Sequence, residues 1–395
     1  MSVRLGLPAL GLATPLGRGK GVVARALFAG ERTGLAPCGG LIPNRDVYVG
    51  AVAGDLPNVP QDLRLFACRN NRLMLLALNE IADDIAAAIR RFGADRIGVV
   101  LGTSTSGMAE TETAFAVYKD QGEWPPEYDY RQNEAGALSE FVQRALRIDG
   151  PAYTVTTACS SSAKVFASAR RLIAAGICDA AIVGGADTLC KFTLNGFSEL
   201  QALSSGLCNP FSLHRDGINI GEGAAAFLMT PDPAPVELMG VGESSDAYHA
   251  SAPDPEGAGA IDAMRQAMQD AQLDGDDIDY INLHGTGTVL NDAMESRALA
   301  VLSLSETPCS STKGMTGHLL GAAGGCEAAF LWLALQRGYS RGQLPPHIWD
   351  GVPDPALPPL NFVKRGATPA NGAGRMLSVS YAFGGSNVAL VLGTG

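Results

Sequence analysis

Short apolar stretches alternate with amphipathic ones along most of the chain. Residues 96–104 (RIGVVLGTS) form a short apolar run that ends in small, polar residues, which is typical of a buried strand followed by a loop. Residues 73–93 place apolar side chains at helical spacing and end at Gly93, which predicts one amphipathic helix. This alternation indicates the α/β class.

The centre of the N-terminal half repeats the alternation at closer range. A β-branched stretch at 152–158 (AYTVTTA) predicts a strand, and residues 160–176 predict a helix that ends at Gly176. The apolar run 179–186 (DAAIVGGA) predicts the next strand. The three together predict a βαβ unit whose crossover begins at Cys159.

The rest of the chain shows the same pattern. The expected elements are a strand at 236–245, a helix at 257–273, a strand at 278–287, a strand, loop and Gly/Ala-rich helix within 308–338, a Pro-rich loop at 345–359 and a hairpin at 376–394. The sequence PDPAP at 231–235 is the best linker candidate. We therefore expect two halves, 1–230 and 236–395, of alternating α/β structure. This fits a duplicated βαβ architecture, although the halves share no strong sequence repeat.

Neither terminus nor interior predicts a membrane segment. Pro8 and several glycines interrupt the apolar start of the chain, so we interpret residues 1–17 as a first core strand and not as a signal peptide. No run of 18 apolar residues exists. The eight cysteines are scattered without a CxxC pair, which favours a reduced, cytoplasmic protein and argues against a structural zinc site.

Charge and glycine content exclude other classes. The net charge of -11 makes a broad nucleic-acid surface unlikely, because phosphate binding needs a basic footprint. The glycine-rich stretches GTSTSG, GINIGEG and GHLLGAAGG match neither phosphate-binding loop pattern, so nothing predicts a nucleotide cofactor. The zinc-protease sequence HExxH is also absent. We expect no metal.

Cys159 is the first candidate for chemistry. It lies among small residues and hydroxyls in TACSSS, where a strand is expected to pass into a helix. A thiol at a helix N-terminus meets the partial positive charge of N–H groups, which should lower its pKa and favour the thiolate. Ala158 and Ser160 leave space for a substrate to approach.

Two of the five histidines stand in a similar setting. His284 ends a predicted strand in NLHGTGT, and His318 begins a predicted helix in KGMTGHLLGAAGG, five residues after Lys313. Residues at such strand ends lie exposed at the edge of an open α/β sheet. His214, His249 and His347 have no such context, and we interpret them as structural or surface residues.

Five motifs occur together in a fixed order. They are TACSSS with Cys159, NPFSLHRDGINIGEGA, HGTGTVLND with His284, SSTKGMTGHLLGAAGGCE with Lys313, His318 and Glu327, and SYAFGGSN with Phe383. The ordered set resembles the elongating β-ketoacyl-acyl carrier protein synthases of the thiolase superfamily, from about residue 3 to the end. The resemblance implies a thiolase fold, in which two βαβ halves form a five-layered α-β-α-β-α core.

The resemblance also implies an acyltransferase. Cys159 would hold an acyl chain as a thioester, malonyl-acyl carrier protein would lose CO₂, and the enolate would extend the chain by two carbons. His284 and His318 would donate N–H groups to the enolate oxygen. Lys313 would orient the His318 region and Glu327 would support it, but the resemblance leaves open which imidazole assists decarboxylation.

The resemblance assigns further residues to substrate binding. The backbone N–H groups of Cys159 and Phe383 would form the oxyanion hole. Thr286 and Thr288 would bind the phosphopantetheine arm of the carrier, and Phe197 and Phe383 would contact the acyl chain. No cofactor is implied beyond that arm.

Several features discriminate within the fold. Chain-initiating synthases have Asn where His318 stands, and chain-length-factor subunits lack the nucleophilic cysteine. Cys309 and Cys326 do not fit the second-cysteine pattern of degradative thiolases. Tyr381 and Ala382 replace two residues of the usual FGFGG, and TACSSS is commoner in polyketide-type enzymes. The substrate therefore stays open between fatty-acid and polyketide or polyene chains.

Two partners are expected. An acidic carrier would dock on Arg64, Arg69 and Arg72, which cluster in an otherwise acidic chain, although a solvated helix face is the alternative. The resemblance implies a dimer, either with a second copy or with a related ketosynthase-like subunit, that places the 152–158 strand near the two-fold axis and the 102–108 loop in the partner's acyl pocket. The non-enzymatic alternative is an idle carrier-binding or chain-length-factor-like subunit.

Overall fold

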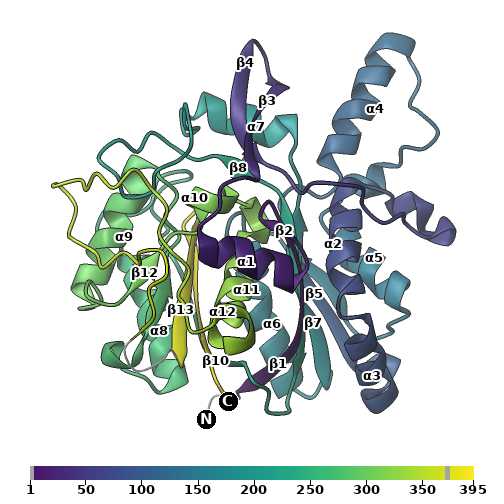
Figure 1. Cartoon of the computed structure of the whole chain (residues 1–395). Helices are drawn as coiled ribbons and strands as arrows, with labels where there is room; N and C mark the ends of the chain where they lie inside the picture. Colours follow the sequence, from purple (N-terminus) through teal and green to yellow (C-terminus); the bar gives the residue numbers. More distant parts are fainter. Residues whose placement is uncertain (1–3, 370–373) are drawn as a thin grey trace.

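The computed structural model describes residues 4–369 and 374–395 (Figure 1). The strands of the N-terminal half are β1 (Leu5–Thr14), β2 (Gly17–Arg18), β3 (Leu35–Ile42), β4 (Arg45–Gly50), β5 (Ile97–Gly102), β6 (Ala152–Val155), β7 (Ala180–Asp187), β8 (Ile220–Gly221) and β9 (Gly223–Thr230). Those of the C-terminal half are β10 (Glu237–Ser245), β11 (Tyr280–Asn282), β12 (Cys309–Ser310), β13 (Arg375–Ala382) and β14 (Ser386–Gly393).

The helices alternate with these strands. They are α1 (Lys20–Ala29), α2 (Arg69–Asn79), α3 (Ala82–Phe92), α4 (Met108–Gln121), α5 (Ala137–Leu146), α6 (Ser161–Ala174), α7 (Lys191–Glu199), α8 (Ala258–Ala271), α9 (Val289–Val301), α10 (Lys313–Thr316), α11 (Ala323–Leu335) and α12 (Arg337–Ser340). Short 3₁₀ turns include η1 (Gln61–Phe66), η3 (Tyr130–Asn133) and η5 (Leu320–Ala322).

The strand order confirms the duplicated architecture. In the N-terminal half the order is β1-β9-β7-β5-β6, and in the C-terminal half it is β10-β14-β13-β11-β12. The two orders correspond strand for strand, and so do the parallel and antiparallel pairings within them. β1 and β10 pair at the seam, where Leu5 faces Leu238, and this joins the two halves into one sheet path.

Helices fill three layers around the strands. α6 and α11 lie between the two halves of the sheet, and their side chains share one large apolar cluster with β1, β7 and β9 (Figure 1). α2, α3 and α5 cover the outer face of the N-terminal half, and α8 and α9 cover the outer face of the C-terminal half. This is the five-layered core of the thiolase fold, as the resemblance implied.

The central helix α11 shows why the layers are close together. Each of its side chains is buried, and its sequence AGGCEAAFLWLAL has no polar face. A helix that is apolar all round must be enclosed on all sides. Small residues let it approach α6 closely, because a Cβ at Gly324 would lie 2.6 Å from the Cβ of Ala163.

The predicted single helix at 73–93 is wrong in one respect. The structure has two helices, α2 and α3, with a break at Ile81, whose φ of -122° and ψ of 20° are not helical. The cause is tertiary: the Glu80 carboxylate accepts the backbone N–H groups of Leu12 at 3.1 Å and Lys20 at 2.8 Å, which ends α2 at that point. The predicted stop at Gly93 is confirmed as the C-cap of α3.

Other predicted elements lie within a few residues of those observed. The predicted first strand, 1–17, contains β1, while residues 1–3 lie outside the described part of the chain. The linker candidate at 231–235 lies between β9, the last strand of the N-terminal half, and β10, the first strand of the C-terminal half. No helix in the described ranges is long and apolar enough to span a bilayer.

Candidate active site

Cys159 lies in a tight turn between β6 and α6. The turn is strained, because Ala158 has a φ of 50° without being glycine. The Ser161 hydroxyl holds it in place: it donates to the Ala158 carbonyl at 2.6 Å and accepts the Thr157 N–H at 2.9 Å. Ser161 therefore fixes the backbone beside the nucleophile, and the predicted place of Cys159 just before a helix is confirmed by the start of α6.

The expected effect of this position on the thiol is wrong. Burial raises the pKa of Cys159 to about 11, although the Lys313 ammonium and the backbone N–H groups of Phe383 and Cys159 act to lower the pKa. Desolvation of the charged form outweighs the helix terminus, because the thiol is enclosed. Cys159 therefore rests as a thiol. The same two N–H groups that face its sulfur are those expected to form the oxyanion hole.

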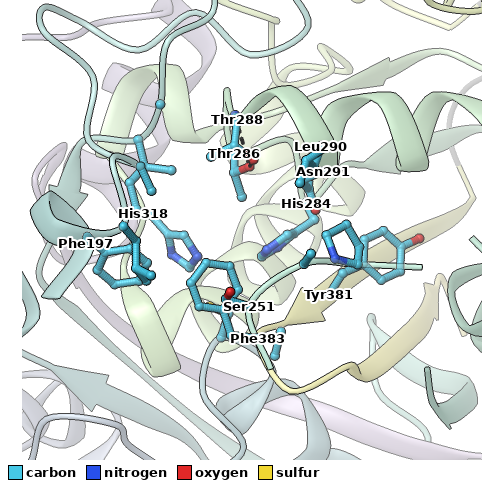
Figure 2. Close-up of a pocket in the computed structure, with 18 of the residues that line it drawn as sticks. Phe197, Ser251, His284, Thr286, Thr288, Leu290, Asn291, His318, Tyr381 and Phe383 are labelled. Atoms are coloured by element: carbon cyan, nitrogen blue, oxygen red, sulfur yellow. Dashed lines mark hydrogen bonds between the residues drawn. The ribbon is translucent and has the colours of Figure 1, made fainter. Parts of the chain in front are cut away.

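The two predicted histidines meet at this thiol. Sγ of Cys159 and a ring nitrogen each of His284 and His318 all lie within 4.8 Å of one another. The two imidazole rings are almost perpendicular, with centroids 5.3 Å apart. Figure 2 shows them on opposite sides of the pocket with ring nitrogens directed into the gap between them. His284 comes from the end of β11 and His318 from the loop after α10, so residues far apart in sequence form one site.

Hydrogen bonds on the far side of each ring set its tautomer. Nδ1 of His318 accepts the backbone N–H of Leu320 at 3.0 Å, and Nδ1 of His284 faces the Lys313 ammonium at 3.4 Å. Since both Nδ1 atoms accept, the ring proton of each neutral imidazole lies on Nε2. Burial, together with Lys313, holds the pKa of both histidines well below 6.5, so both rings stay neutral N–H donors.

Lys313 and Glu327 form a buried ion pair behind the histidines. Both side chains are almost completely buried, and Glu327 lies on α11 while Lys313 begins α10. Burial raises the pKa of Glu327 and the Lys313 ammonium acts to lower that pKa. The pair therefore holds the Lys313 ammonium beside His284, whereas the resemblance had assigned Lys313 to the His318 region.

Two buried acids that the sequence reading missed support the His284 loop. The Glu295 carboxylate accepts the backbone N–H groups of His284 and Gly285, both at 2.7 Å. Asp292, one turn earlier on α9, accepts the Phe211 N–H at 2.7 Å. Burial raises the pKa of Glu295 to about 8 and that of Asp292 to about 6. Two acids three residues apart at a helix start were the signal in VLNDAMES.

His347 is a structural residue with a partner on each ring nitrogen. It is buried, its Nδ1 accepts the Ser311 N–H at 3.1 Å, and its Nε2 lies 3.1 Å from the Pro210 carbonyl. The structural role predicted for it is therefore the observed one. It connects the loop before Lys313 to the loop at 208–217.

A thiol with two imidazoles is also a zinc-like donor set, and its fit to a metal can be tested. Zinc would require a bare nitrogen on each ring, which means losing the bond from Leu320 to His318. The Lys313 ammonium beside His284 would repel a cation. The donors thus suit an oxyanion better than a metal ion.

The remaining predicted substrate residues line the same cavity of about 320 Å³. Thr286 and Thr288, whose hydroxyls lie 2.9 Å apart, form one wall. Phe197 from α7 and Phe383 lie at the opposite side, with ring centroids 5.6 Å apart and ring planes tilted by 41° (Figure 2). The cavity is therefore walled by hydroxyls on one side and by aromatic rings on the other.

The three arginines predicted to dock the carrier lie outside this cavity and differ in exposure. Arg69 makes two hydrogen bonds to the Glu222 carboxylate, and Arg72 donates to the carbonyls of Leu56 and Pro57. Arg64 is exposed and lines a separate cavity with Arg69. Of the three, Arg64 is exposed, whereas Arg69 and Arg72 are half-buried.

Comparison with known proteins gives a consistent family. Residues 59–234 match the family model described as "Beta-ketoacyl synthase, N-terminal domain" and residues 236–348 match "Beta-ketoacyl synthase, C-terminal domain". The chain is 33% identical to the "3-oxoacyl-[acyl-carrier-protein] synthase 2" of Staphylococcus aureus, with 82% of this chain and 83% of that protein covered. It is 32% identical to the protein of the same name from Synechocystis, with 80% and 79% covered.

Solved structures include two similar ketosynthases that were determined with partner subunits. The ketosynthase ApeO, solved in complex with its chain length factor ApeC from Xenorhabdus doucetiae, is 43% identical, with a TM-score of 0.94 over 100% of this chain and 98% of that chain. The ishigamide ketosynthase/chain length factor is 28% identical, with a TM-score of 0.89 over the whole of both chains.

Proposed function

Because the chain belongs to the β-ketoacyl synthase family, we propose that it is an acyltransferase that condenses an acyl thioester with malonyl-acyl carrier protein. The product is a 3-oxoacyl carrier two carbons longer than the starting acyl group. The arrangement of Cys159, His284 and His318 supports the following course for the reaction.

The first step loads the acyl group. Sγ of Cys159 attacks the carbonyl carbon of the acyl-carrier thioester, and the negative charge that develops on oxygen is met by the backbone N–H groups of Cys159 and Phe383. The carrier thiol leaves with the proton that the cysteine gives up. The apolar wall with Phe197 then encloses the chain held on Cys159.

The second step forms the nucleophile. The malonyl thioester loses CO₂ as its carbon–carbon bond breaks, and the electron pair becomes a thioester enolate. The enolate oxygen accepts the Nε2–H groups of His284 and His318, which point into the same gap. The Thr286 and Thr288 hydroxyls lie where they can bond the carrier's phosphopantetheine arm.

The third step joins the two fragments. The enolate carbon attacks the acyl carbonyl on Cys159, the oxyanion again lies at the N–H groups of Cys159 and Phe383, and its collapse releases the thiolate, which takes up a proton. All bonds are made and broken among the two substrates and Cys159. The proposal needs no cofactor beyond the carrier's own arm.

The observation that carries this proposal is the convergence of a thiol with two neutral N–H donors in one cavity. Intact-protein mass spectrometry tests it with saturated, unsaturated and aryl acyl-carrier thioesters, followed by malonyl-carrier. The wild type should gain one acyl group and then release a product two carbons longer. Cys159→Ala should gain none. Cys178→Ala, which removes another buried thiol, should behave like the wild type. Acylation of Cys159→Ala would contradict the proposal.

The main alternative is an idle subunit that only binds a carrier or a sister chain. The names of two similar structures include a chain length factor, so such a role exists among relatives. The intact pairing of Cys159 with His284, His318 and Lys313 favours the enzyme, because a binding subunit has no use for it. The substrate stays open between fatty-acid and polyketide or polyene chains, because packing differences of about 1–3 kcal/mol per methylene decide such choices.

Two partners follow from the proposal. The carrier protein brings both substrates, and a ketosynthase-like subunit completes a dimer, as in the complexes with chain length factors. All eight cysteines are free thiols, which supports a reducing compartment such as the cytoplasm.

A surface on α4 suits the sister subunit. Among the α4 residues only Ala114 is buried, and Phe115, Tyr118 and Trp124 are exposed. The Tyr118 and Trp124 rings stack at 4.8 Å, so these aromatics form a preordered patch, and α4 stands away from the core in Figure 1. Residues 108–135 hold seven acidic and two basic side chains, which suits a partner whose contact face is less acidic. We assign this patch to a chain-length-factor-like subunit with a less acidic face.

A further inference from the structure

Asp187 is a buried carboxylate that the reaction described above does not use. It ends β7 and its side chain has no exposed surface. Six groups donate hydrogen bonds to it at 2.5–2.8 Å, of which five belong to the loop after β5: the Thr103 hydroxyl, and the backbone N–H and hydroxyl of both Ser104 and Thr105. Such a number of donors holds a carboxylate, and whatever it bonds, in one position.

The sixth donor lies in the other half of the molecule. The backbone N–H of Gly321, in η5, donates to Oδ2 of Asp187 at 2.5 Å. Asp187 belongs to the half that carries Cys159, whereas Gly321 belongs to the half that carries both histidines. The carboxylate is therefore a direct link between the two halves beside the active site.

The residue between Gly321 and the His318 loop is strained. Leu320 has a φ of 53°, a conformation that a branched side chain rarely adopts. It persists because both flanking N–H groups are bonded: that of Leu320 to Nδ1 of His318 at 3.0 Å, and that of Gly321 to Asp187 and, at 3.2 Å, to the Ser104 hydroxyl. The Ser104 hydroxyl is itself held by Asp187, so loss of the carboxylate weakens both bonds of Gly321. The strained turn can then relax, and the bond from Leu320 to His318 moves with it.

We propose that Asp187 is a positioning residue for decarboxylation, which acts through the 320–321 turn to hold His318 with its Nε2–H in the pocket. The inference rests on the proposed function and adds a residue to it. Asp187 touches no reacting atom. Its effect is to keep the strained turn, and so the tautomer and direction of the His318 ring, fixed while the enolate forms.

The loading step should not depend on this link. The oxyanion hole for acyl transfer uses the N–H groups of Cys159 and Phe383, and neither bonds Asp187. The negative charge of Asp187 acts to raise the pKa of Cys159, so removal of that charge should make the thiol slightly easier to ionise. The two half-reactions should therefore respond differently: decarboxylation should fall, and loading should not.

The test compares the half-reactions in purified Asp187→Asn. We expect the rate of malonyl-carrier decarboxylation to fall about 10- to 100-fold, which is less than the effect of losing an entire oxyanion donor. The change should appear in kcat, while KM for malonyl-carrier stays the same. Acylation of Cys159, followed by intact mass, should stay at the wild-type rate or rise, and its alkylation profile should shift to lower pH.

Thr103→Val is the matched control. It removes one donor to the same carboxylate without touching Gly321, and valine keeps the buried shape of threonine. It should lower the melting temperature while decarboxylation stays near wild type. Loss of stability alone therefore does not reproduce the expected split.

Gly321→Ala approaches the same contact from the other side. An added Cβ would lie 2.7 Å from Oδ2 of Asp187 and 2.9 Å from the Ser104 nitrogen, which forces the turn away. It should give the same split as Asp187→Asn, and it keeps the proposal testable if the Asn variant does not fold. Equal losses in both half-reactions, or unchanged decarboxylation in either variant, would overturn the role of Asp187. Absence of acylation in the wild type would instead overturn the proposed function.

Discussion

The chemical state of each residue in this site depends on the groups that contact it from the side away from the pocket. His284 and His318 are alike in sequence context, yet one is held by an ammonium and the other by a backbone N–H from a strained turn. The sequence predicts both as active-site residues because His284 ends a predicted strand and His318 begins a predicted helix, each within a glycine-rich stretch. It does not predict the state of Cys159, because the helix terminus can be read from the pattern but the depth of burial cannot. Asp187 was missed because its partners come from distant segments.

Replacement of His318 by alanine should separate the two half-reactions. The Nε2–H donor is lost, and a single oxyanion donor is worth about 10²–10³ in rate, so malonyl decarboxylation should fall by that factor. Acylation of Cys159 should continue, because its oxyanion lies at other N–H groups. Stopped-flow or quenched assays of each half-reaction measure this, and His214→Ala serves as the control, because His214 is exposed and does not line the pocket. Equal loss in both steps would place His318 in acyl transfer as well.

Glu295 should make the stability depend on pH. Its pKa is raised from its ordinary 4.5 to about 8 by burial, so between these values the folded chain holds a proton that the unfolded chain releases. The folded state is therefore favoured at the acid end of this window, and that contribution is lost as pH rises through about 8. The free energy of unfolding of the wild type relative to Glu295→Gln should decline from about pH 5 to about pH 8 in urea titrations. A pH-independent difference would mean that Glu295 is ionised throughout.

At the scale of elements, apolar periodicity located most strands and helices, including β5, β7, α6 and α8. The predicted helix boundaries were wrong where a side chain bonds a distant segment. Glu80 is the example, because its hydrogen bonds to β1 and α1 divide one predicted helix into α2 and α3. The close contact of α6 with α11 was not predictable either, because it depends on which small residues face each other.

That contact leads to a prediction for Gly324. Alanine there would place a Cβ 2.6 Å from Ala163, so the central helices must separate, and overpacking of this kind costs about 1–3 kcal/mol in the free energy of unfolding. Gly338→Ala is the control, because a Cβ there meets nothing within 4 Å and alanine should be neutral or slightly stabilising. Denaturant unfolding of Gly324→Ala and Gly338→Ala tests this prediction. Equal free energies of unfolding for the two variants would mean that the central helical layer can expand without loss of stability.

The start of α2 and the turn η1 give a prediction for the carrier. Arg64 is exposed, whereas Arg72 is bonded to two carbonyls. Arg64→Glu should raise KM for the acyl carrier without changing the melting temperature, and Arg72→Glu should lower the melting temperature. Steady-state kinetics at low salt together with thermal unfolding distinguish them. If KM for the carrier is unchanged in Arg64→Glu, Arg64 does not dock the carrier, and the alternative of a solvated helix face holds.

At the scale of the whole molecule, the family resemblance gave the five-layered fold correctly, whereas the patterns alone gave only a duplicated α/β chain. The surface was the least predictable part. The apolar residues of α4 have no interior to enter in a single chain, and no periodicity marks them as an interface. What covers them depends on another molecule.

The α4 patch should therefore govern assembly. Co-expression with the chain length factor ApeC, the partner of the 43% identical ApeO, should give a heterodimer by light scattering. Phe115→Glu with Tyr118→Glu should abolish it without lowering the melting temperature, because both side chains are exposed in the single chain. The assignment would be contradicted if the wild-type chain were monomeric both alone and after co-expression with ApeC. A homodimer that the double variant leaves intact would also contradict it.

The seam at β1 has a consequence for synthesis on the ribosome. β1 is translated first, and apart from the two-residue β2 its partners β9 and β10 begin only at residues 223 and 237. At about 5–20 residues per second, the nascent strand waits roughly ten to forty seconds for the edges it will join. During that interval the apolar segment LGLPALGLAT lacks both β9 and β10, so β1 can enter its place in the sheet only after most of the N-terminal half has been synthesised.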